Sequence, residues 1–204
     1  MSPSRSARAS VRATRLRVTP RVLTNQMADR SLIFLLDRSG SMETCCDDTI
    51  GGFNSFVKDQ AALGGKLTLI QFDHEYLMSY ENKPLGEVEP LTTTTFKPRG
   101  STALLDAIGR AIKECKTESI PTIIILTDGQ ENSSRTYTKA HIKDLIFERQ
   151  KEGWTFMYLG ANQDAFAEAG SIGIDPAGTM NFDVNKTPDV FRALSATVSQ
   201  RATY

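Results

Sequence analysis

Short apolar runs alternate along this chain with longer segments in which apolar residues recur at helical spacing. Residues 32–36 and 122–126 are nearly continuous apolar runs, of the kind that form parallel strands buried on both faces. Residues 66–72 alternate as a strand, and the short connection at 73–75 makes the strand after it antiparallel. The predicted strands are residues 32–36, 66–72, 76–80, 122–126, 154–159 and 179–184.

Helical spacing fills the segments between these strands. Residues 81–99 are polar and contain three prolines, so they are predicted to form a loop with one short helical turn. Alternating strands and helices predict an α/β fold: a doubly wound, mostly parallel six-stranded sheet with one antiparallel edge strand and helices on both faces. The predicted helices are residues 47–61, 104–115, a segment around 142–149 that Gly153 closes, a short helix ending near Gly170, and 187–198.

Residues 1–29 form a basic segment that differs in composition from residues 30–204, which are predicted to be one domain. Residues 1–30 contain seven arginines and a single acid, Asp29, and they show no apolar periodicity, which is typical of a segment without a fixed structure of its own. Three interpretations stay open: a basic tail, a transit peptide, or an over-extended reading frame whose true start is Met27. The third is favoured because Met27 leads straight into the first strand.

The composition disfavours several partners and settings. With 204 residues and balanced formal charge, the chain is long enough for one large α/β domain. Residues 31–204 contain 17 basic and 23 acidic residues, an acidic excess that disfavours nucleic acid as the main partner. Three cysteines give neither a disulfide framework nor a zinc-binding spacing, so a reduced, cytoplasmic setting is expected. No apolar run approaches the ~18 residues of a membrane span, and no secretory signal is expected.

The most informative polar cluster follows the first predicted strand directly. Asp37, Ser39 and Ser41 alternate along the loop after residues 32–36. Such a loop lies at the carboxyl end of a strand, where open α/β sheets bind their ligands. Alternate positions let one loop aim a carboxylate and two hydroxyls at the same point. Oxygen donors of this kind suit a hard divalent cation whose shell is completed by water.

Two later loops supply matching donors. Thr102 comes just before the helix 104–115, and Asp128 directly follows the strand 122–126. Together with the first loop, they resemble the metal-ion-dependent adhesion site (MIDAS) of the von Willebrand factor A domain, in which Asp-x-Ser-x-Ser is followed by a distant Thr and a distant Asp. The resemblance covers about residues 30–200 and implies that family's fold. Five residues match in type, order and approximate spacing: Asp37, Ser39, Ser41, Thr102 and Asp128.

The resemblance also implies a function. Ser39, Ser41 and Thr102 would bind the metal directly, whereas Asp37 and Asp128 would hold coordinated waters and orient the hydroxyls. Mg²⁺ is the expected ion, with Mn²⁺ or Ca²⁺ as substitutes. One coordination position would be left for an Asp or Glu carboxylate of a protein partner. The family therefore implies an adaptor or scaffold, here of the intracellular prokaryotic or phage type, and homo-oligomerisation stays open.

Two alternatives stay open beside this interpretation. The first keeps the fold without the metal, as a structural subunit that assembles through its helical faces. The second is a metal-dependent phosphoesterase. A phosphatase of the haloacid dehalogenase kind needs a second acid two residues after the first, where this chain has Ser39. Because the pattern supplies neither a proton shuttle nor a nucleophile, we do not expect an enzyme.

Histidine and cysteine residues have simpler interpretations. His74 is expected in an exposed turn and His141 on a helix surface, and neither is expected to bind metal. Cys45 and Cys46 lie on the same rim as the metal loop. A buried pair at a helix start is favoured there, and a thiol that senses redox state or contacts the partner is the alternative.

Three further positions near the predicted site are expected to have structural roles. Asp106 is expected to be a structural acid. Thr102 can cap the helix that follows it as well as bind a metal. Residues 162–164 follow a strand, and a helix cap is favoured for them over a place on the ligand-binding face.

Overall fold

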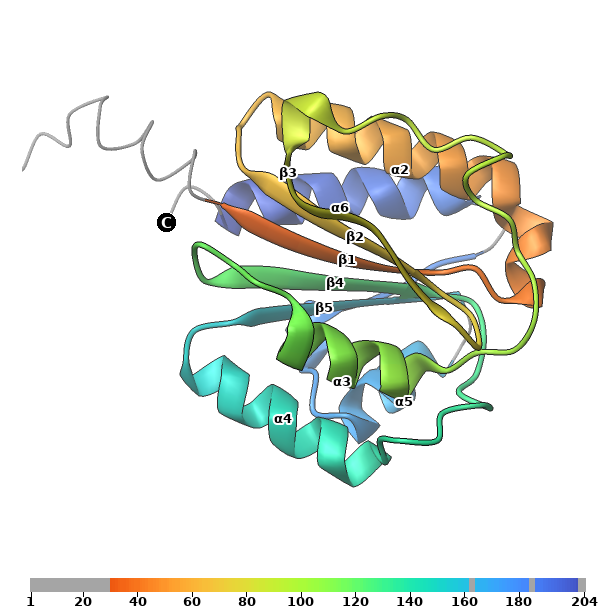
Figure 1. Ribbon diagram of the computed structural model, residues 1–204, viewed down its shortest axis with the longest axis vertical. Helices are drawn as coiled ribbons and strands as arrows, with labels where there is room; N and C mark the ends of the chain where they lie inside the picture. Colours follow the sequence, from red (N-terminus) through yellow and green to blue (C-terminus); the bar gives the residue numbers. More distant parts are fainter. Residues whose placement is uncertain (1–29, 162–163, 184–185, 202–204) are drawn as a thin grey trace, which may run out of the picture.

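A six-stranded sheet forms the centre of the computed structural model, which describes residues 30–161, 164–183 and 186–201 (Figure 1). The strands are β1 (Ser31–Asp37), β2 (Lys66–Phe72), β3 (Tyr76–Pro84), β4 (Pro121–Thr127), β5 (Thr155–Gly160) and β6 (Thr179–Asn181). They lie in the order β3-β2-β1-β4-β5-β6. The β2–β3 pair is antiparallel and the other four pairs are parallel, which confirms the predicted fold class. The prediction for residues 1–29 lies outside the described residues.

Helices cover both faces of this sheet (Figure 1). On one face lie α2 (Cys46–Ala61) and α6 (Thr187–Arg201), and on the other lie α3 (Leu104–Glu114), α4 (Lys139–Lys151) and α5 (Ala165–Ser171). The central strand β1 is buried along its whole length. A strand with a helical layer on each side has no polar face, which explains why its sequence is an uninterrupted apolar run.

The side chains of β1 alternate between two hydrophobic cores. Phe34 makes edge-to-face contacts with Phe53 and Phe56 of α2, with ring centres 5.3 and 5.7 Å apart. Phe191 of α6 stacks on the same ring at 6.3 Å. Ile33 belongs to the opposite core, which is built with α3, α4 and α5. Because both cores hold β1, the loop that follows this strand starts from a fixed position.

Two element boundaries before α3 differ from the prediction. β3 continues to Pro84 instead of ending at residue 80, because an edge strand with an exposed side accepts polar residues. Its pairing with β2 includes register shifts, and Asn82 there has a φ of 48°. The loop after β1 continues as a 3₁₀ helix, η1 (Gly40–Cys45), so α2 begins immediately after it.

The predicted helical turn in the loop 81–99 is present as η2 (Leu85–Glu87). Near the carboxyl end, η3 (Pro176–Gly178) precedes β6. β6 ends before the predicted limit of residue 184, because β5 offers it partners only over the last part of its length, Tyr158–Gly160. None of the helices within the described residues has the length and apolar character needed to cross a membrane.

Candidate metal centre

The five predicted MIDAS residues lie on three loops at the carboxyl edge of the sheet. β1 and β4 are parallel neighbours at the point where the strand order reverses, so the loops that carry Asp37 and Asp128 start side by side. The loop that carries Thr102 is joined to the first loop through the main chain, because the Gly40 N–H donates to the Gly100 carbonyl oxygen at 3.1 Å. The fold therefore brings together residues that are far apart in the sequence.

Three hydroxyl oxygens converge on one small space beside Gly129. A Cβ atom built on this glycine would lie 2.8 Å from Thr102 Oγ1 and 3.3 Å from the Oγ atoms of both Ser39 and Ser41. The two serine oxygens lie 3.1 Å apart and share a hydrogen bond. Glycine leaves this space open, and the hydroxyls around it fit a hard divalent cation in their chemistry.

Asp37 is fully buried and fixes the start of the first loop. Its Oδ1 accepts a hydrogen bond from the Ser39 N–H at 2.7 Å, and its Oδ2 accepts one from the Thr127 hydroxyl at 2.5 Å. Burial raises the pKa of Asp37 to about 6, although the hydrogen bonds from Thr127 and Ser39 oppose this effect. A cation close to such a buried carboxylate favours its charged form.

Asp128 is bonded directly to one of the predicted ligands. The Ser41 hydroxyl donates to Asp128 Oδ1 at 2.7 Å, which orients the oxygen lone pairs of Ser41. Burial raises the pKa of Asp128 as well. Within the part of the chain that the structure describes, no group of three or more His, Cys, Asp and Glu side chains could hold a metal ion. A metal site there consequently depends on the hydroxyl donors.

Asn132 holds the main chain of Thr102 through two hydrogen bonds. The sequence did not predict this role. The Thr102 N–H donates to Asn132 Oδ1 at 2.8 Å, and the Thr102 carbonyl accepts from the Asn132 N–H at 3.0 Å. The loop that begins with Asp128 thus also fixes Thr102. Two of the predicted metal residues are positioned by the same segment.

The same segment caps the first turn of α3. Glu131 Oε2 accepts a hydrogen bond from the Leu105 N–H at 2.9 Å, and Ser134 Oγ accepts one from the Asp106 N–H at 3.0 Å. The N-cap residue itself, Ala103, contributes no side-chain bond. The capping considered for Thr102 is therefore done by side chains of another loop.

Asp106 has the structural role that was predicted for it. Its carboxylate accepts the backbone N–H groups of Arg135, Thr136 and Tyr137, each at 2.9 Å. Burial acts to raise the pKa of Asp106, but these N–H groups outweigh it and lower the pKa. Side chains of the loop after Asp128 thus bind backbone groups of the Thr102 segment, and Asp106 of that segment binds backbone groups of the loop in return.

The two cysteines near the metal loop have the environment of structural thiols. Cys45 is buried, donates to the Met42 carbonyl and accepts from the Thr49 hydroxyl, while Cys46 is partly buried. Burial raises the pKa of both thiols. A thiol with a raised pKa carries less thiolate at neutral pH, which favours the structural interpretation of both cysteines.

The two histidines and Asp164, considered in the sequence as further candidates, lie in a turn, on a helix surface and at a helix start. His141 is exposed on α4 and His74 is half-exposed in the β2–β3 turn, both as predicted. Asp164 occupies the N-cap position of α5, but its side chain makes no capping hydrogen bond. The predictions for residues 162 and 163 lie outside the described residues.

Solved structures with the same architecture identify the fold. The vWF domain of the type V pili tip protein Mfa5 from Porphyromonas gingivalis aligns over 87% of this chain and 97% of its own, with a TM-score of 0.65 at 12% identity. The fold is that of a von Willebrand factor A domain. Manganese-loaded TRAP from Plasmodium vivax aligns over 83% of this chain and 74% of its own, with a TM-score of 0.57 at 15% identity.

A further structural neighbour is a matrix protein of the mussel byssus. Proximal thread matrix protein 1 from the mussel byssus, with a zinc-occupied MIDAS motif, aligns over 84% of this chain with a TM-score of 0.61 at 17% identity. The match spans a little under half of the mussel chain, 46%. At such low identities, the structural likeness shows the fold and not the function. No family model and no curated protein matches the sequence.

Proposed function

We propose that this chain is a von Willebrand A module that binds a protein partner through a divalent cation. The observation that carries the proposal is the open space beside Gly129, which three hydroxyl oxygens surround. Neutral hydroxyl ligands leave most of the charge of a cation uncompensated, so the ion keeps its attraction for an anionic ligand. The carboxylate of an Asp or Glu side chain on a partner protein is the ligand that this arrangement favours.

The five residues divide into two groups in this proposal. Ser39, Ser41 and Thr102 would hold Mg²⁺, with Mn²⁺ or Ca²⁺ as substitutes, and the ion would supply the point that attracts the carboxylate. Asp37 and Asp128 orient the donors through their hydrogen bonds to the Ser39 N–H and the Ser41 hydroxyl. The zinc- and manganese-loaded neighbours support divalent metal binding in this fold.

Binding without catalysis fits the surroundings of the site. Within the described residues, neither histidine side chain is hydrogen-bonded to the three hydroxyls: His74 lies against Asp73 and Glu75, and His141 is exposed on α4. Ser39 stands where a phosphatase would need its second acid. Pilus and matrix proteins among the structural neighbours support a role in protein interactions. An adaptor or scaffold is therefore proposed, and its cytoplasmic setting stays a prediction.

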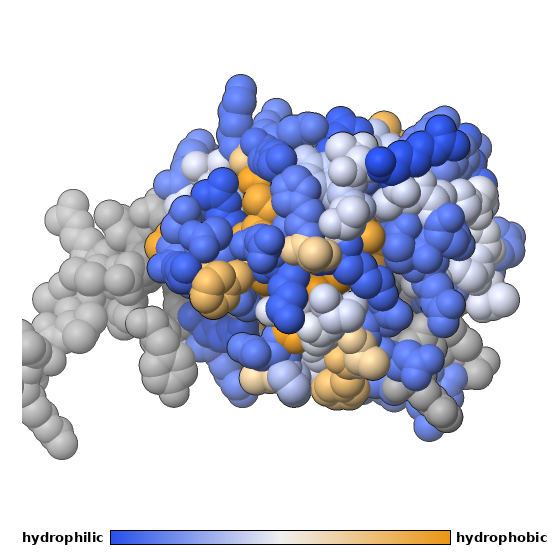
Figure 2. Space-filling model, turned by 90° about the horizontal axis from the view of Figure 1, so that it is seen from below, coloured by the Kyte–Doolittle hydropathy of each residue, from blue (hydrophilic) through white to orange (hydrophobic). Residues whose placement is uncertain are grey.

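Assembly through the helical faces without a metal has less support. On the underside of the molecule, where α4 lies, hydrophobic residues form small patches among hydrophilic ones (Figure 2). Large apolar side chains that are exposed in the described residues come from separate elements: Leu77, Ile120, Phe147 and Phe166. Isolated apolar residues of this kind are normal on a protein surface and do not require a partner.

Thr102→Ala tests the metal site directly, and Ser101→Ala is its matched control because it removes the neighbouring hydroxyl. Isothermal calorimetry with Mg²⁺ and Mn²⁺ should show binding by the unchanged chain and about tenfold or greater weakening in Thr102→Ala. The control should bind as the unchanged chain does, and the melting temperatures without metal should stay close. No binding by the unchanged chain, or equal binding by Thr102→Ala, contradicts the proposal.

A short peptide with one Asp, compared with its Asn analogue, tests the open coordination position. With Mn²⁺ present, the Asp peptide should bind more tightly than the Asn peptide, and EDTA should remove the difference. Equal binding of both peptides contradicts the carboxylate part of the proposal.

A further inference from the structure

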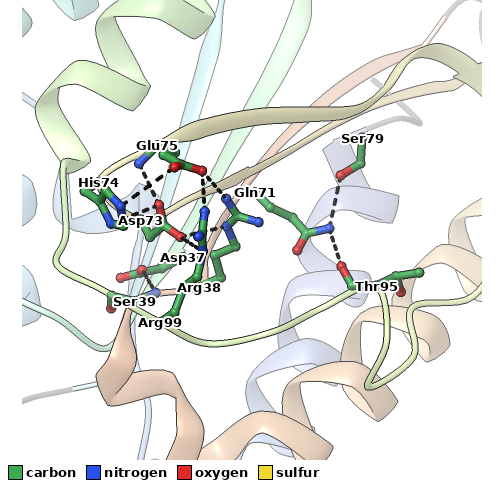
Figure 3. Close-up of polar contacts among 10 residues, drawn as sticks. All are labelled: Asp37, Arg38, Ser39, Gln71, Asp73, His74, Glu75, Ser79, Thr95 and Arg99. Atoms are coloured by element: carbon green, nitrogen blue, oxygen red, sulfur yellow. Dashed lines mark hydrogen bonds and ion pairs between the residues drawn. The ribbon is translucent and has the colours of Figure 1, made fainter.

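Four charged side chains from the loops around the candidate metal centre contact one another, and His74 lies against the two acids among them (Figure 3). The four charged side chains come from three segments: the loop 37–41 after β1, the β2–β3 turn and the loop that leads to Thr102. Two are positive and two are negative, so the cluster is balanced in charge. The four residues are Arg38, Asp73, Glu75 and Arg99.

Asp73 lies at the centre of this cluster. Its side chain is fully buried, and its Oδ2 lies 3.1 Å from Arg38 Nε and 3.0 Å from Arg99 Nε. Its Oδ1 accepts a hydrogen bond from the Glu75 N–H at 2.6 Å. Glu75 in turn contacts Arg99 and lies 3.7 Å from Arg38. A single buried carboxylate therefore joins an arginine from each of two loops.

These two loops are the ones that carry the hydroxyl donors. Arg38 stands between Asp37 and Ser39, and Arg99 comes three residues before Thr102 in the sequence. A third bond reaches the other flank of Thr102, because the N–H of the next residue, Ala103, donates to the Asp73 carbonyl oxygen at 2.9 Å.

Main-chain bonds follow the same connections. The Arg99 N–H donates to the Arg38 carbonyl at 2.7 Å, and the Arg38 N–H donates to the Phe72 carbonyl at 2.8 Å. The loop that leads to Arg99 is anchored further back by Gln71, whose amide donates to the Thr95 carbonyl at 3.0 Å. The charged side chains thus reinforce a contact that the backbone already makes.

We infer that Asp73 is a positioning residue of the metal site. By joining the two loops, it holds the Thr102 hydroxyl in place relative to those of Ser39 and Ser41. The inference rests on the proposed function, because it concerns the affinity of that site for its ion. A buried ion pair adds little to stability compared with apolar packing, and the role we assign to this one is to fix a single geometry of the two loops. A metal site needs such selection, since its donors must be held to within about 0.5 Å.

Charge alone gives a different expectation, and the difference can be measured. If the cluster acted on the ion by long-range attraction, losing Asp73 would weaken metal binding and losing Arg99 would strengthen it. Positioning requires both losses to weaken binding, because each breaks the same connection. The two variants therefore separate the explanations by the sign of one effect.

The experiment is a Mn²⁺ titration of the full chain, followed by the electron paramagnetic resonance of free Mn²⁺. Asp73→Asn and Arg99→Gln should each weaken binding by about tenfold. The double variant should lose no more than either single variant. Glu118→Gln is the control, because it removes an exposed carboxylate paired with Lys66 at the opposite end of β2, and it should bind as the unchanged chain does. Unchanged or tighter binding by Arg99→Gln overturns the inference.

Hydrogen exchange of the metal-free chain gives a second measurement that does not depend on the ion. The amides of Gly40, Arg99 and Ala103 should exchange about tenfold faster in Asp73→Asn, while the amides of β1 and β4 stay protected. Unchanged protection at these three amides overturns the inference. If the unchanged chain binds no Mn²⁺, the proposed function fails, and exchange still decides on positioning. If Asp73→Asn does not fold, both measurements are made on Arg99→Gln. This variant is expected to fold, because the Arg99 side chain is 47% exposed.

Discussion

The loop after β1 has two sides that hold polar groups in different ways. On one side, the Ser39 and Ser41 hydroxyls, together with Thr102, surround a space that Gly129 leaves open. On the other side, Arg38 points into a balanced cluster around the buried Asp73 (Figure 3). Hydroxyls beside buried acids have capacity left for a cation, whereas the paired charges have already neutralised each other. The hydroxyl side is therefore the part that would bind the cation, and the charged cluster is the part that holds the loops in position.

Breaking the paired side should have the largest effect on stability. Asp73→Ala leaves Arg38 buried without its main partner, the two side chains being 10% and 0% exposed in the pair. Loss of one member of a buried pair costs about 3–5 kcal/mol in the free energy of unfolding. Urea unfolding of the metal-free chain measures this change.

An exposed pair provides the control for that measurement. Glu114→Gln breaks the ion pair with Arg110 on the surface of α3, where the two side chains are 49% and 42% exposed. Such pairs contribute about 0.5 kcal/mol or less. Similar small losses in both variants would show that burial gives the Asp73 cluster no special weight.

Filling the open side should change binding more than stability. In Gly129→Ala, the new methyl group occupies the space among the hydroxyls, 2.8 Å from Thr102 Oγ1, without removing any donor. We expect the affinity for Mg²⁺ or Mn²⁺ to fall by about a hundredfold or more, a change of about 2.8 kcal/mol in binding free energy. Isothermal calorimetry measures the affinity, and urea unfolding measures the smaller loss of stability.

Gly51→Ala is the matched glycine control, because a Cβ atom there meets no atom within 4 Å. It lies within α2, so alanine should stabilise the chain by about 0.5–1 kcal/mol and leave metal affinity unchanged. Metal binding by Gly129→Ala at the strength of the unchanged chain would mean that the ion does not use the space among the hydroxyls.

The two sides of the loop also differ in how far the sequence predicted them. Asp37, Ser39 and Ser41 follow an apolar strand at fixed spacing, and Asp128 follows the neighbouring strand, so strand order alone places them at one edge. The sequence predicted the six strands and the helical layers for the same reason, since periodicity is a local property. The affinity of the site for a metal stays a prediction.

The supporting contacts were missed because they join distant segments. Nothing in the spacing of Arg38, Asp73 and Arg99 indicates that they meet, and the caps of α3 come from Glu131 and Ser134 on a loop about one helix and one strand later. Glu, Asn and Ser gathered after Asp128 are a capping composition, but composition does not identify the helix that is capped. Long-range pairing of this kind is set by the tertiary fold.

Apart from the control variants, the smallest predicted effect concerns Asp106, which holds the Asp128 segment against α3 through three backbone N–H groups. Because these bonds lower the pKa of Asp106 in the folded chain, its stabilising effect is present above the ordinary Asp pKa of about 3.9 and is lost as the pH falls through the lower folded value. Asp106→Asn should cost about 1 kcal/mol at pH 7. The difference from the unchanged chain, followed by urea unfolding at pH 7, 5 and 3, should shrink at the lowest pH. A difference that stays constant across this range would mean that the charge of Asp106 adds nothing to its hydrogen bonds.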